Sequence, residues 1–268
     1  MHNSVSFNGG LCAPTELTIP ALSSAALFGK GIFTTLAVLD REPFLWEKHW
    51  QRLQESSRRL GLDLENFNEK KTRQAFEELV IANSVRNARA RITFFEESAS
   101  GVWPYNADHG TSLLIMTADL KPEPRNLSLT RSPYRLNSSS PLAGVKSCNY
   151  VEKILAKNEA RQRGFDECLQ LNERQGVTSA AMANVFWLKN GRLFTPSLDT
   201  GCLPGTTREF ILENIECIEL ETGIEELRSS DQIFLTSAGL GVVQAAEFDG
   251  RELKHDAHPI MNLIPRRD

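Results

Sequence analysis

The chain has 268 residues, of which 41% are hydrophobic and 24% are charged, as in a water-soluble globular protein with one large or two modest domains. Its formal net charge of −4 and the lack of a basic cluster argue against nucleic-acid binding. No apolar run approaches the ~18 residues of a membrane span, and the first residues open no signal peptide, so we expect no membrane partner. The cysteines are odd in number and scattered, which predicts reduced thiols in a cytoplasmic protein: Cys12, Cys148, Cys168, Cys202 and Cys217.

The first 120 residues predict a domain that mixes strands and helices. Residues 4–7 followed by Asn8-Gly9-Gly10 predict a β-hairpin, and the second half of residues 27–39 is strand-like. Residues 44–60 are amphipathic at helical spacing, because apolar and aromatic side chains fall near one face: Trp46, His49, Trp50, Leu53 and Leu60. A helix over residues 65–82 and strands over 90–95 and 112–117 are expected to follow.

A polar, proline-rich stretch at residues 121–126 is typical of a linker. We therefore expect an N-terminal α/β domain over residues 1–120, a linker over 121–127 and a C-terminal domain over 128–268 that carries Lys146. The elements predicted in the C-terminal domain are a helix over 150–164, a strand over 167–172, a hairpin joining 185–188 to 193–196 through Asn190-Gly191, a helix after Thr206, a strand over 232–237, a hairpin turn at Asp249-Gly250 and a short final helix.

Lys146 stands at the end of an apolar segment, Leu142-Ala143-Gly144-Val145, directly before a predicted helix. Most lysines are solvated surface charges, so the residue by itself identifies no site. An ammonium between apolar walls loses solvation, however, and its pKa should fall, which makes the amine a better nucleophile and base. These are the properties that a Schiff-base lysine requires.

The segment Pro204-Gly205-Thr206-Thr207 opens a predicted helix. Backbone N–H groups and hydroxyls at such a position can bind an anion such as a phosphate, which the helix dipole also favours. Thr206 and Glu209 also fit a capping box, which is a purely structural device. The two explanations remain open from this motif alone.

Three segments, in this order and spacing, resemble the fold-type IV pyridoxal-phosphate enzymes. They are Leu142–Asn149, Gly176–Trp187 and Leu203–Phe210. This family contains branched-chain and D-amino-acid aminotransferases and 4-amino-4-deoxychorismate lyase. The segments Phe28-Gly29-Lys30-Gly31-Ile32-Phe33 and His49-Trp50-Gln51-Arg52-Leu53 also match family motifs, and the Phe-Thr-Thr sequence at 33–35 resembles the lyase branch most.

The resemblance implies an α/β (α+β), two-domain fold like that of D-amino-acid aminotransferase, with a smaller N-terminal and a larger C-terminal domain. It also implies a homodimer and pyridoxal 5′-phosphate in the cleft between the domains. Lys146 would hold the cofactor as an imine and move protons, with Thr34 or Thr35 facing the substrate. The other implied cofactor contacts are Arg52, Ser179, Asn184, Thr206 and Thr207. The implied substrate pocket contains Phe33, Phe94, Ser237 and Ala238.

The alternative for His49 and Arg52 is a packed core histidine and a helix-surface arginine. His255 and His258 are three residues apart without an acidic or cysteine partner, so we expect surface residues and no metal site.

Two positions depart from the family pattern. Ser179 stands where the family usually has a glutamate that keeps the pyridine nitrogen protonated, so we expect weakened transamination and less weakened elimination. Phe94-Phe95-Glu96-Glu97 stands where relatives often have an Arg-Gly that binds the substrate carboxylate, which argues against an anionic substrate.

The preferred interpretation is a pyridoxal-phosphate-dependent lyase resembling 4-amino-4-deoxychorismate lyase, an enzyme of folate biosynthesis, which eliminates pyruvate to give 4-aminobenzoate. The alternatives are a class IV aminotransferase on a branched-chain or D-amino acid, and a degenerate cofactor-binding protein with weak activity. In each case the partner is a small amine or amino acid.

Overall fold

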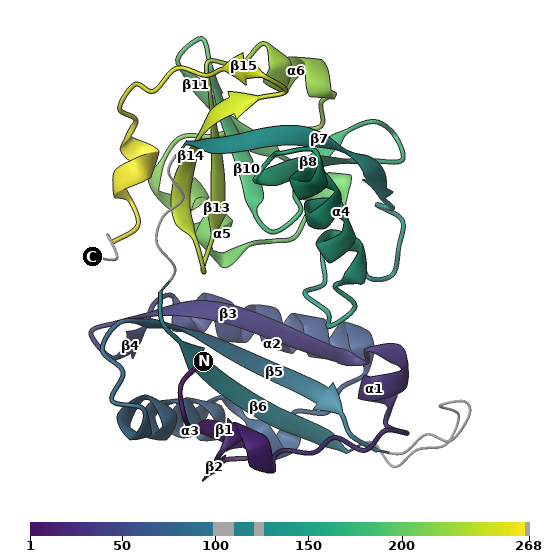
Figure 1. The fold of residues 1–268 in the computed structure, drawn as a ribbon, viewed down its shortest axis with the longest axis vertical. Coiled ribbons are helices and arrows are strands. Elements are labelled where there is room, and N and C mark those ends of the chain that lie inside the picture. Colours follow the sequence, from purple (N-terminus) through teal and green to yellow (C-terminus); the bar gives the residue numbers. More distant parts are fainter. Residues whose placement is uncertain (99–109, 121–125, 266–268) are drawn as a thin grey trace. The chain divides into compact units, whose positions relative to one another are not determined.

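The computed structural model describes residues 1–98, 110–120 and 126–265. The chain forms two compact units (Figure 1). Unit 1 comprises Met1–Leu120 together with Val145–Asn149, and unit 2 comprises residues 121–144 and 150–266. The segment that carries Lys146 therefore packs with unit 1, although its neighbours on both sides in the chain pack with unit 2. Most of the expected linker, residues 121–125, lies outside the described residues.

The described part of unit 1 contains a six-stranded sheet in which every pair of neighbouring strands is antiparallel. The strand order is β2-β1-β6-β5-β3-β4. The strands are β1 (Val5–Phe7), β2 (Gly10–Cys12), β3 (Gly31–Leu39), β4 (Glu42–Pro43), β5 (Ala88–Glu96) and β6 (Thr111–Ala118). The expected N-terminal hairpin is confirmed as β1 and β2, and the expected strands appear as β3, β5 and β6.

Two helices, α2 (Trp46–Leu60) and α3 (Glu69–Ala82), cover one face of this sheet (Figure 1). A shorter helix, α1 (Ser24–Phe28), leads into β3, and 3-10 turns occupy Pro14–Glu16 and Glu65–Phe67. The helix predicted over 65–82 is interrupted because Asn68 has extended backbone angles and its side chain accepts a hydrogen bond from Lys71 N at 3.1 Å. Asn68 thus acts as the N-cap of α3.

Side chains of β3 and β5 alternate between the helix-covered face and the opposite face. Ile32, Leu36 and Phe94 belong to the hydrophobic core beneath α2 and α3, where Phe94 is fully buried against Trp50. Phe33 pairs with Thr93 across the strands, so it lies on the opposite face. Phe94 therefore packs in the core and not beside Phe33, which differs from the expectation that both line one pocket.

The described part of unit 2 contains a nine-stranded mixed sheet. Its strands are β7 (Leu127–Leu136), β8 (Glu167–Asn172), β9 (Val177–Ala180), β10 (Asn184–Lys189), β11 (Arg192–Pro196), β12 (Ile218–Leu220), β13 (Gln232–Ser237), β14 (Gly241–Phe248) and β15 (Arg251–Glu252). The order is β12-β11-β10-β13-β14-β7-β8-β9, with β15 paired to β14. The predicted hairpin of β10 and β11 is confirmed, and its turn residues Asn190 and Gly191 have the positive φ angles that such a turn requires.

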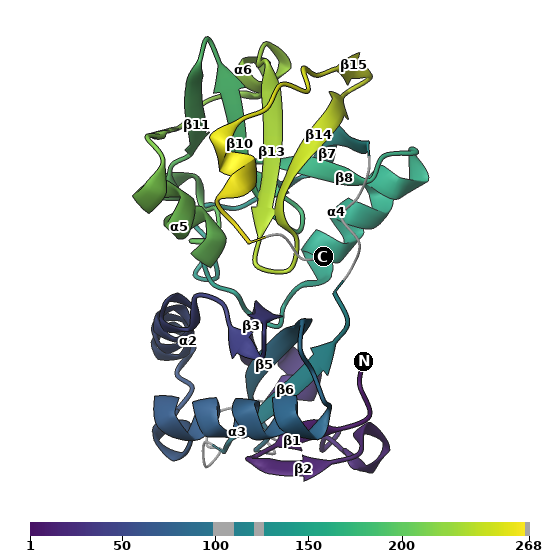
Figure 2. The same ribbon diagram turned by 90° about the vertical axis from the view of Figure 1, so that its left-hand side faces the viewer.

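The helices of unit 2 are α4 (Val151–Gln162), α5 (Thr206–Asn214) and α6 (Ile224–Arg228), with 3-10 turns at Leu198–Thr200 and Pro259–Asn262. Helix α4 packs against β7 and β8, and α5 packs against β13 (Figure 2). The predicted helices at 150–164 and after Thr206 are confirmed as α4 and α5. Within the described residues, the structure has no helix long and apolar enough to cross a membrane.

Candidate functional site

In unit 1, two cationic side chains lie over the ring of Phe33. The Lys146 ammonium nitrogen is 4.3 Å from the ring centroid, and the Arg91 guanidinium carbon is 3.7 Å from it. Arg91 is also fixed by a 3.1 Å hydrogen bond from its Nε to Thr93 Oγ1. A lysine amine and an arginine guanidinium are thus held on one aromatic side chain.

Main-chain hydrogen bonds hold Lys146 in this place. Phe33 N donates to Lys146 O at 2.9 Å, and Cys148 N donates to Gly31 O at 2.7 Å, so the segment runs antiparallel to the start of β3. A Cβ atom on Gly31 would lie 2.9 Å from the Phe94 carbonyl oxygen and 3.0 Å from Cys148 Sγ. The second glycine of the Phe-Gly-Lys-Gly motif is therefore required for the close approach of the lysine segment to the sheet.

On the helix-covered face of β3, the half-buried Arg52 forms a network with the buried Thr34 and His49. Arg52 Nη2 donates to Thr34 Oγ1 at 2.7 Å, and Thr34 Oγ1 lies 2.6 Å from His49 Nδ1. Thr34 and Thr35 point to opposite faces of the strand, and Thr35 is on the face of Phe33. Thr34 therefore positions Arg52, whereas Thr35 is the threonine on the side of Lys146.

The pKa of His49 is lowered well below its ordinary value of 6.5, chiefly by burial and further by the positive charges of Arg52 and Lys146. A neutral imidazole can accept a hydrogen bond from the Thr34 hydroxyl at Nδ1. The Thr34 oxygen can then accept the hydrogen bond from Arg52. The histidine thereby fixes the direction of both hydrogen bonds and the orientation of the guanidinium.

In unit 2, the start of α5 is formed by Gly205, Thr206 and Thr207, and both threonines are buried. Gly205 is the N-cap, without a side-chain cap, and a Cβ atom there would collide with Asn184 Oδ1. Asn184 Nδ2 donates to Leu203 O at 2.8 Å and so fixes the preceding turn. The first N–H groups of a helix have no intrahelical partner, and together with two hydroxyls they suit a phosphate.

Three further predicted residues also belong to unit 2. Ser179 lies in β9 directly opposite Gln170 of β8, and both are buried. Ser237 ends β13, where its Oγ accepts a hydrogen bond from Leu240 N at 3.1 Å, and Ala238 follows it. Thr236, one residue earlier, pairs in the sheet with Asn184, which is the first residue of β10. Ser237 and Ala238 therefore come directly after the residue that pairs with Asn184.

The predicted residues thus fall into two groups, one in each unit. Unit 1 carries Phe33, Thr35 and Lys146 on one face of its sheet, and Thr34, Arg52 and Phe94 on the helix-covered side. Unit 2 carries Ser179, Asn184, Thr206, Thr207, Ser237 and Ala238. Sequence reasoning missed Arg91. The available signal was its alternation with Thr93, which places both on the face of Phe33 once the register of β3 and β5 is known.

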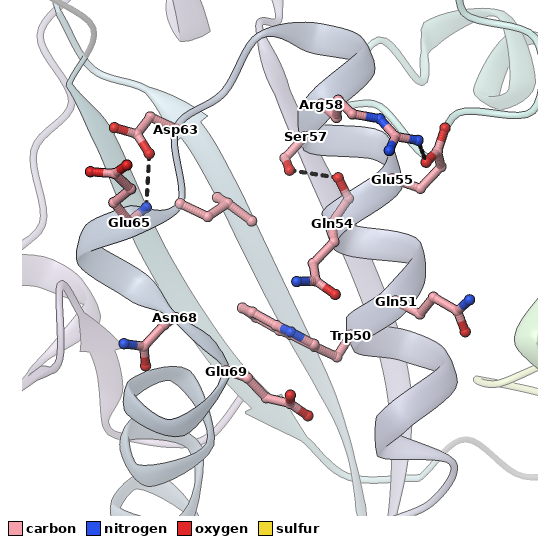
Figure 3. Close-up of a pocket in the computed structure, with 11 residues that line it drawn as sticks. Trp50, Gln51, Gln54, Glu55, Ser57, Arg58, Asp63, Glu65, Asn68 and Glu69 are labelled. Carbon is pink, nitrogen blue, oxygen red and sulfur yellow. Dashed lines mark hydrogen bonds and ion pairs between the residues drawn. The ribbon is translucent and has the colours of Figure 1, made fainter.

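A separate cavity of about 890 Å³ lies between α2 and α3 in unit 1 (Figure 3). Its lining is largely polar and acidic: Trp50, Gln51, Gln54, Glu55, Ser57, Arg58, Asp63, Leu64, Glu65, Asn68 and Glu69. It contains none of the residues that were predicted to bind the cofactor or the substrate, so it is distinct from the Lys146 group.

We predict that His49 makes stability depend on pH. Because its pKa is depressed in the folded state, the neutral ring contributes fully above the ordinary pKa of 6.5, and the contribution is lost as the pH falls below that value. For one proton, the free energy of unfolding falls by at most about 1.4 kcal/mol per pH unit. Chemical denaturation at pH 8 and pH 5 should show a smaller pH dependence in His49→Gln. The exposed residue His255 provides a control variant, His255→Gln, and an equal change in both variants would contradict the prediction.

The chain is similar in sequence and in fold to known enzymes. The aminodeoxychorismate lyase of Bacillus subtilis (strain 168) is 27% identical over 245 residues, which cover 88% of this chain and 83% of the relative. The branched-chain-amino-acid aminotransferase of Escherichia coli (strain K12) is 24% identical over 262 residues, which cover 91% of this chain and 84% of the relative.

Among solved structures, the branched-chain aminotransferase of the thermophilic archaeon Thermoproteus uzoniensis with norvaline matches with a TM-score of 0.90 at 24% identity, covering 98% of this chain and 92% of that chain. This likeness confirms the expected fold. The family model described as amino-transferase class IV matches residues 31–248, which is most of the chain. The protein therefore belongs to the class IV aminotransferase family.

Proposed function

We propose that this protein binds pyridoxal 5′-phosphate through Lys146 and acts as a lyase on a small amine that carries a carboxylate. The observation that carries the proposal is the pair of cations on Phe33, with the Lys146 amine 4.3 Å and the Arg91 guanidinium 3.7 Å from one ring. One group can react with an aldehyde, and the other can bind the substrate carboxylate.

Residues of each unit, taken separately, fit a part of the cofactor. In unit 2, α5 begins without a side-chain cap, so its first backbone N–H groups, together with Thr206 and Thr207, can bind a phosphate. In unit 1, Arg52, which donates to Thr34, is a donor of the kind that binds phosphate. When bound, pyridoxal phosphate supplies an electron sink for the carbon that bears the substrate nitrogen.

Lys146 has two tasks in this proposal. When the cofactor is bound, the Lys146 amine would hold it covalently until a substrate amine takes its place. The released Nζ, held by the main-chain pairing of residues 145–149, then accepts a proton from the carbon that bears the amine. Thr35 is the hydroxyl on this face of β3 and would contact the substrate.

Arg91 supplies a guanidinium, which the segment after Thr93 lacks. The sequence suggested that a substrate carboxylate would be uncompensated, because no Arg-Gly follows Ile92-Thr93. Arg91 is half-buried and lies on the Lys146 side of the sheet, so it can bind such a carboxylate. An anionic substrate is therefore compatible with this site.

Elimination is the preferred reaction because of Ser179 and because a lyase is among the relatives. With aminodeoxychorismate as substrate, loss of pyruvate would leave 4-aminobenzoate, which would make the protein an enzyme of folate biosynthesis. The E. coli relative favours a second candidate, transfer of the amino group from a branched-chain amino acid to a keto acid. A degenerate cofactor-binding protein is the third candidate.

The proposal predicts an absorbance band at roughly 400 nm after incubation with pyridoxal phosphate, from the protonated lysine imine. Borohydride should remove the band and leave the cofactor covalently attached at Lys146, and Lys146→Ala should lack it. Lys153→Ala controls for attachment to a neighbouring lysine. Pyruvate release from aminodeoxychorismate supports the lyase, and keto-acid exchange supports the aminotransferase. A wild-type protein without the band would overturn the cofactor assignment.

A second prediction concerns Arg91. In the cofactor-loaded protein, Arg91→Met should raise the apparent Kd for leucine roughly 10–100-fold, as expected for loss of a charge-assisted hydrogen bond. The apparent Kd for isopentylamine, which lacks the carboxylate, should stay unchanged. Spectral titration measures both values. Arg89, on the same strand and bonded to Asp119 O, provides the matched control Arg89→Met. Equal losses for leucine and isopentylamine would contradict the assignment.

We also propose that the protein is a homodimer through an exposed apolar stripe on α4. Val151, Ile154 and Leu155 are 64%, 46% and 52% exposed in the single chain, and their spacing places them near one side of the helix. Contiguous apolar surface of this kind is typical of a contact between proteins.

Sedimentation velocity should give a mass near twice the 30.0 kDa chain. The double variant Ile154→Glu and Leu155→Glu should sediment as a monomer, because burying two carboxylates in an apolar contact is costly. An Ile81→Glu variant is the control, since Ile81 is 72% exposed on α3. A wild-type monomer would rule the proposal out.

A further inference from the structure

The side chain of Cys148 lies on the Lys146 side of the sheet in unit 1. Ser147, between these two residues, is buried opposite Ile32, which belongs to the core beneath the helices. Because side chains alternate along an extended segment, those of Lys146 and Cys148 project from the other face. The thiol and the Lys146 amine therefore share one face within a single unit.

The lack of a side chain at Gly31 makes room for this thiol. Cys148 N donates to Gly31 O at 2.7 Å, which holds the two backbones together. A Cβ atom on Gly31 would lie 3.0 Å from Cys148 Sγ and 3.0 Å from the Cβ atom of Phe95. The sulfur thus packs over the position that a side chain would occupy, and its place on the sheet is fixed by this packing and by the backbone bond.

The half-buried Cys148 thiol contacts the guanidinium of Arg91. Burial raises the pKa of the thiol, whereas the charge of Arg91, its hydrogen bond with the thiol and the charge of Lys146 oppose part of that increase. A guanidinium has donors only, so the sulfur is the acceptor of this hydrogen bond. Because the thiol is neutral at pH 7, it holds the guanidinium without neutralising its charge.

Two other contacts hold the Arg91 side chain but leave donors available. The guanidinium carbon lies 3.7 Å from the centroid of the Phe33 ring, and Nε donates to Thr93 Oγ1 at 3.1 Å. With Nε engaged by Thr93, the four N–H groups on the two Nη atoms remain. These are enough for a sulfur acceptor and for both oxygens of a carboxylate.

We propose that Cys148 is a positioning residue for Arg91. Its sulfur accepts a hydrogen bond from the guanidinium and holds that group over the Phe33 ring in the orientation that binds a substrate carboxylate. The inference rests on the proposed function, in which Arg91 binds this carboxylate. Cys148 thereby favours amino acids over simple amines, because its contribution to binding passes through Arg91.

The first test is a spectral titration of the cofactor-loaded, full-length protein. Cys148→Ala should raise the apparent Kd for leucine roughly 3–10-fold, as expected for the loss of one hydrogen bond, and should leave the apparent Kd for isopentylamine unchanged. Cys148→Ser should bind leucine like the wild type, because a hydroxyl can also accept from Arg91. In the Arg91→Met background, Cys148→Ala should have no further effect on leucine binding, since the two residues act as one unit.

Cys12→Ala is the matched control, because Cys12 is also a half-buried cysteine of unit 1 but lies in β2, opposite Val5. An unchanged Kd for leucine in Cys148→Ala would overturn the inference. Equal losses for leucine and isopentylamine would also overturn it, and so would a further loss in the Arg91→Met background.

A second measurement needs no cofactor. ¹³C NMR of protein labelled at cysteine Cβ follows the ionisation of each thiol, and the Cys148 signal is the one that disappears in Cys148→Ser. Because the guanidinium charge favours the thiolate, ionisation should begin at a higher pH in Arg91→Met than in the wild type. Arg89→Met should leave it unchanged, since Arg89 donates to Asp119 O.

The two measurements separate the inference from the proposed function. Equal ionisation profiles for the wild type and Arg91→Met would overturn the inference and leave the proposed function intact. A wild type without the imine band would overturn the proposed function, and with it the role of Cys148 in substrate binding.

Discussion

The candidate site depends on the main-chain pairing between residues 145–149 and the start of β3. The bonds from Phe33 N to Lys146 O and from Cys148 N to Gly31 O fix the lysine backbone on the sheet edge, and Gly31 makes the approach sterically possible. The ring of Phe33 then provides the surface over which the Lys146 amine and the Arg91 guanidinium lie. The reactive amine is therefore carried by a segment anchored to a rigid strand, which is the arrangement that accurate positioning requires.

Arg52 in unit 1 and the start of α5 in unit 2 are each supported by neighbours within their own unit. Arg52 is oriented through Thr34 by a neutral, buried His49, and the turn before α5 is fixed by the bond from Asn184 to Leu203. In unit 1, the supporting hydroxyl of Thr34 lies on the face of β3 opposite to that of Phe33. The threonine pair at 34–35 illustrates the division, because one hydroxyl supports the arginine while the other shares the face of Phe33.

Much of the fold followed from local patterns, whereas part of the site depended on register. The strands at 167–172 and 232–237 and the turn at Asn190-Gly191 were predicted at the observed positions because apolar runs and turn residues are local signals. Phe94 was grouped with Phe33 because it stands where relatives often have an Arg-Gly that binds the substrate, and only the pairing of β3 with β5 shows that the two rings face opposite sides. Arg91 was missed for the same reason, since Phe33 is distant from it in sequence and comes close only through the pairing of β3 with β5.

The mode of attachment of the lysine segment has a consequence for replacing its side chain. Phe33 N, Lys146 O, Cys148 N and Gly31 O are all main-chain atoms, and their bonds form whatever residue occupies position 146. Removing the amine therefore leaves the anchoring intact, so folding and chemistry at this position are separable. Without the lysine side chain, a space of the size of an aliphatic amine would remain over the Phe33 ring. A small external amine could diffuse into that space.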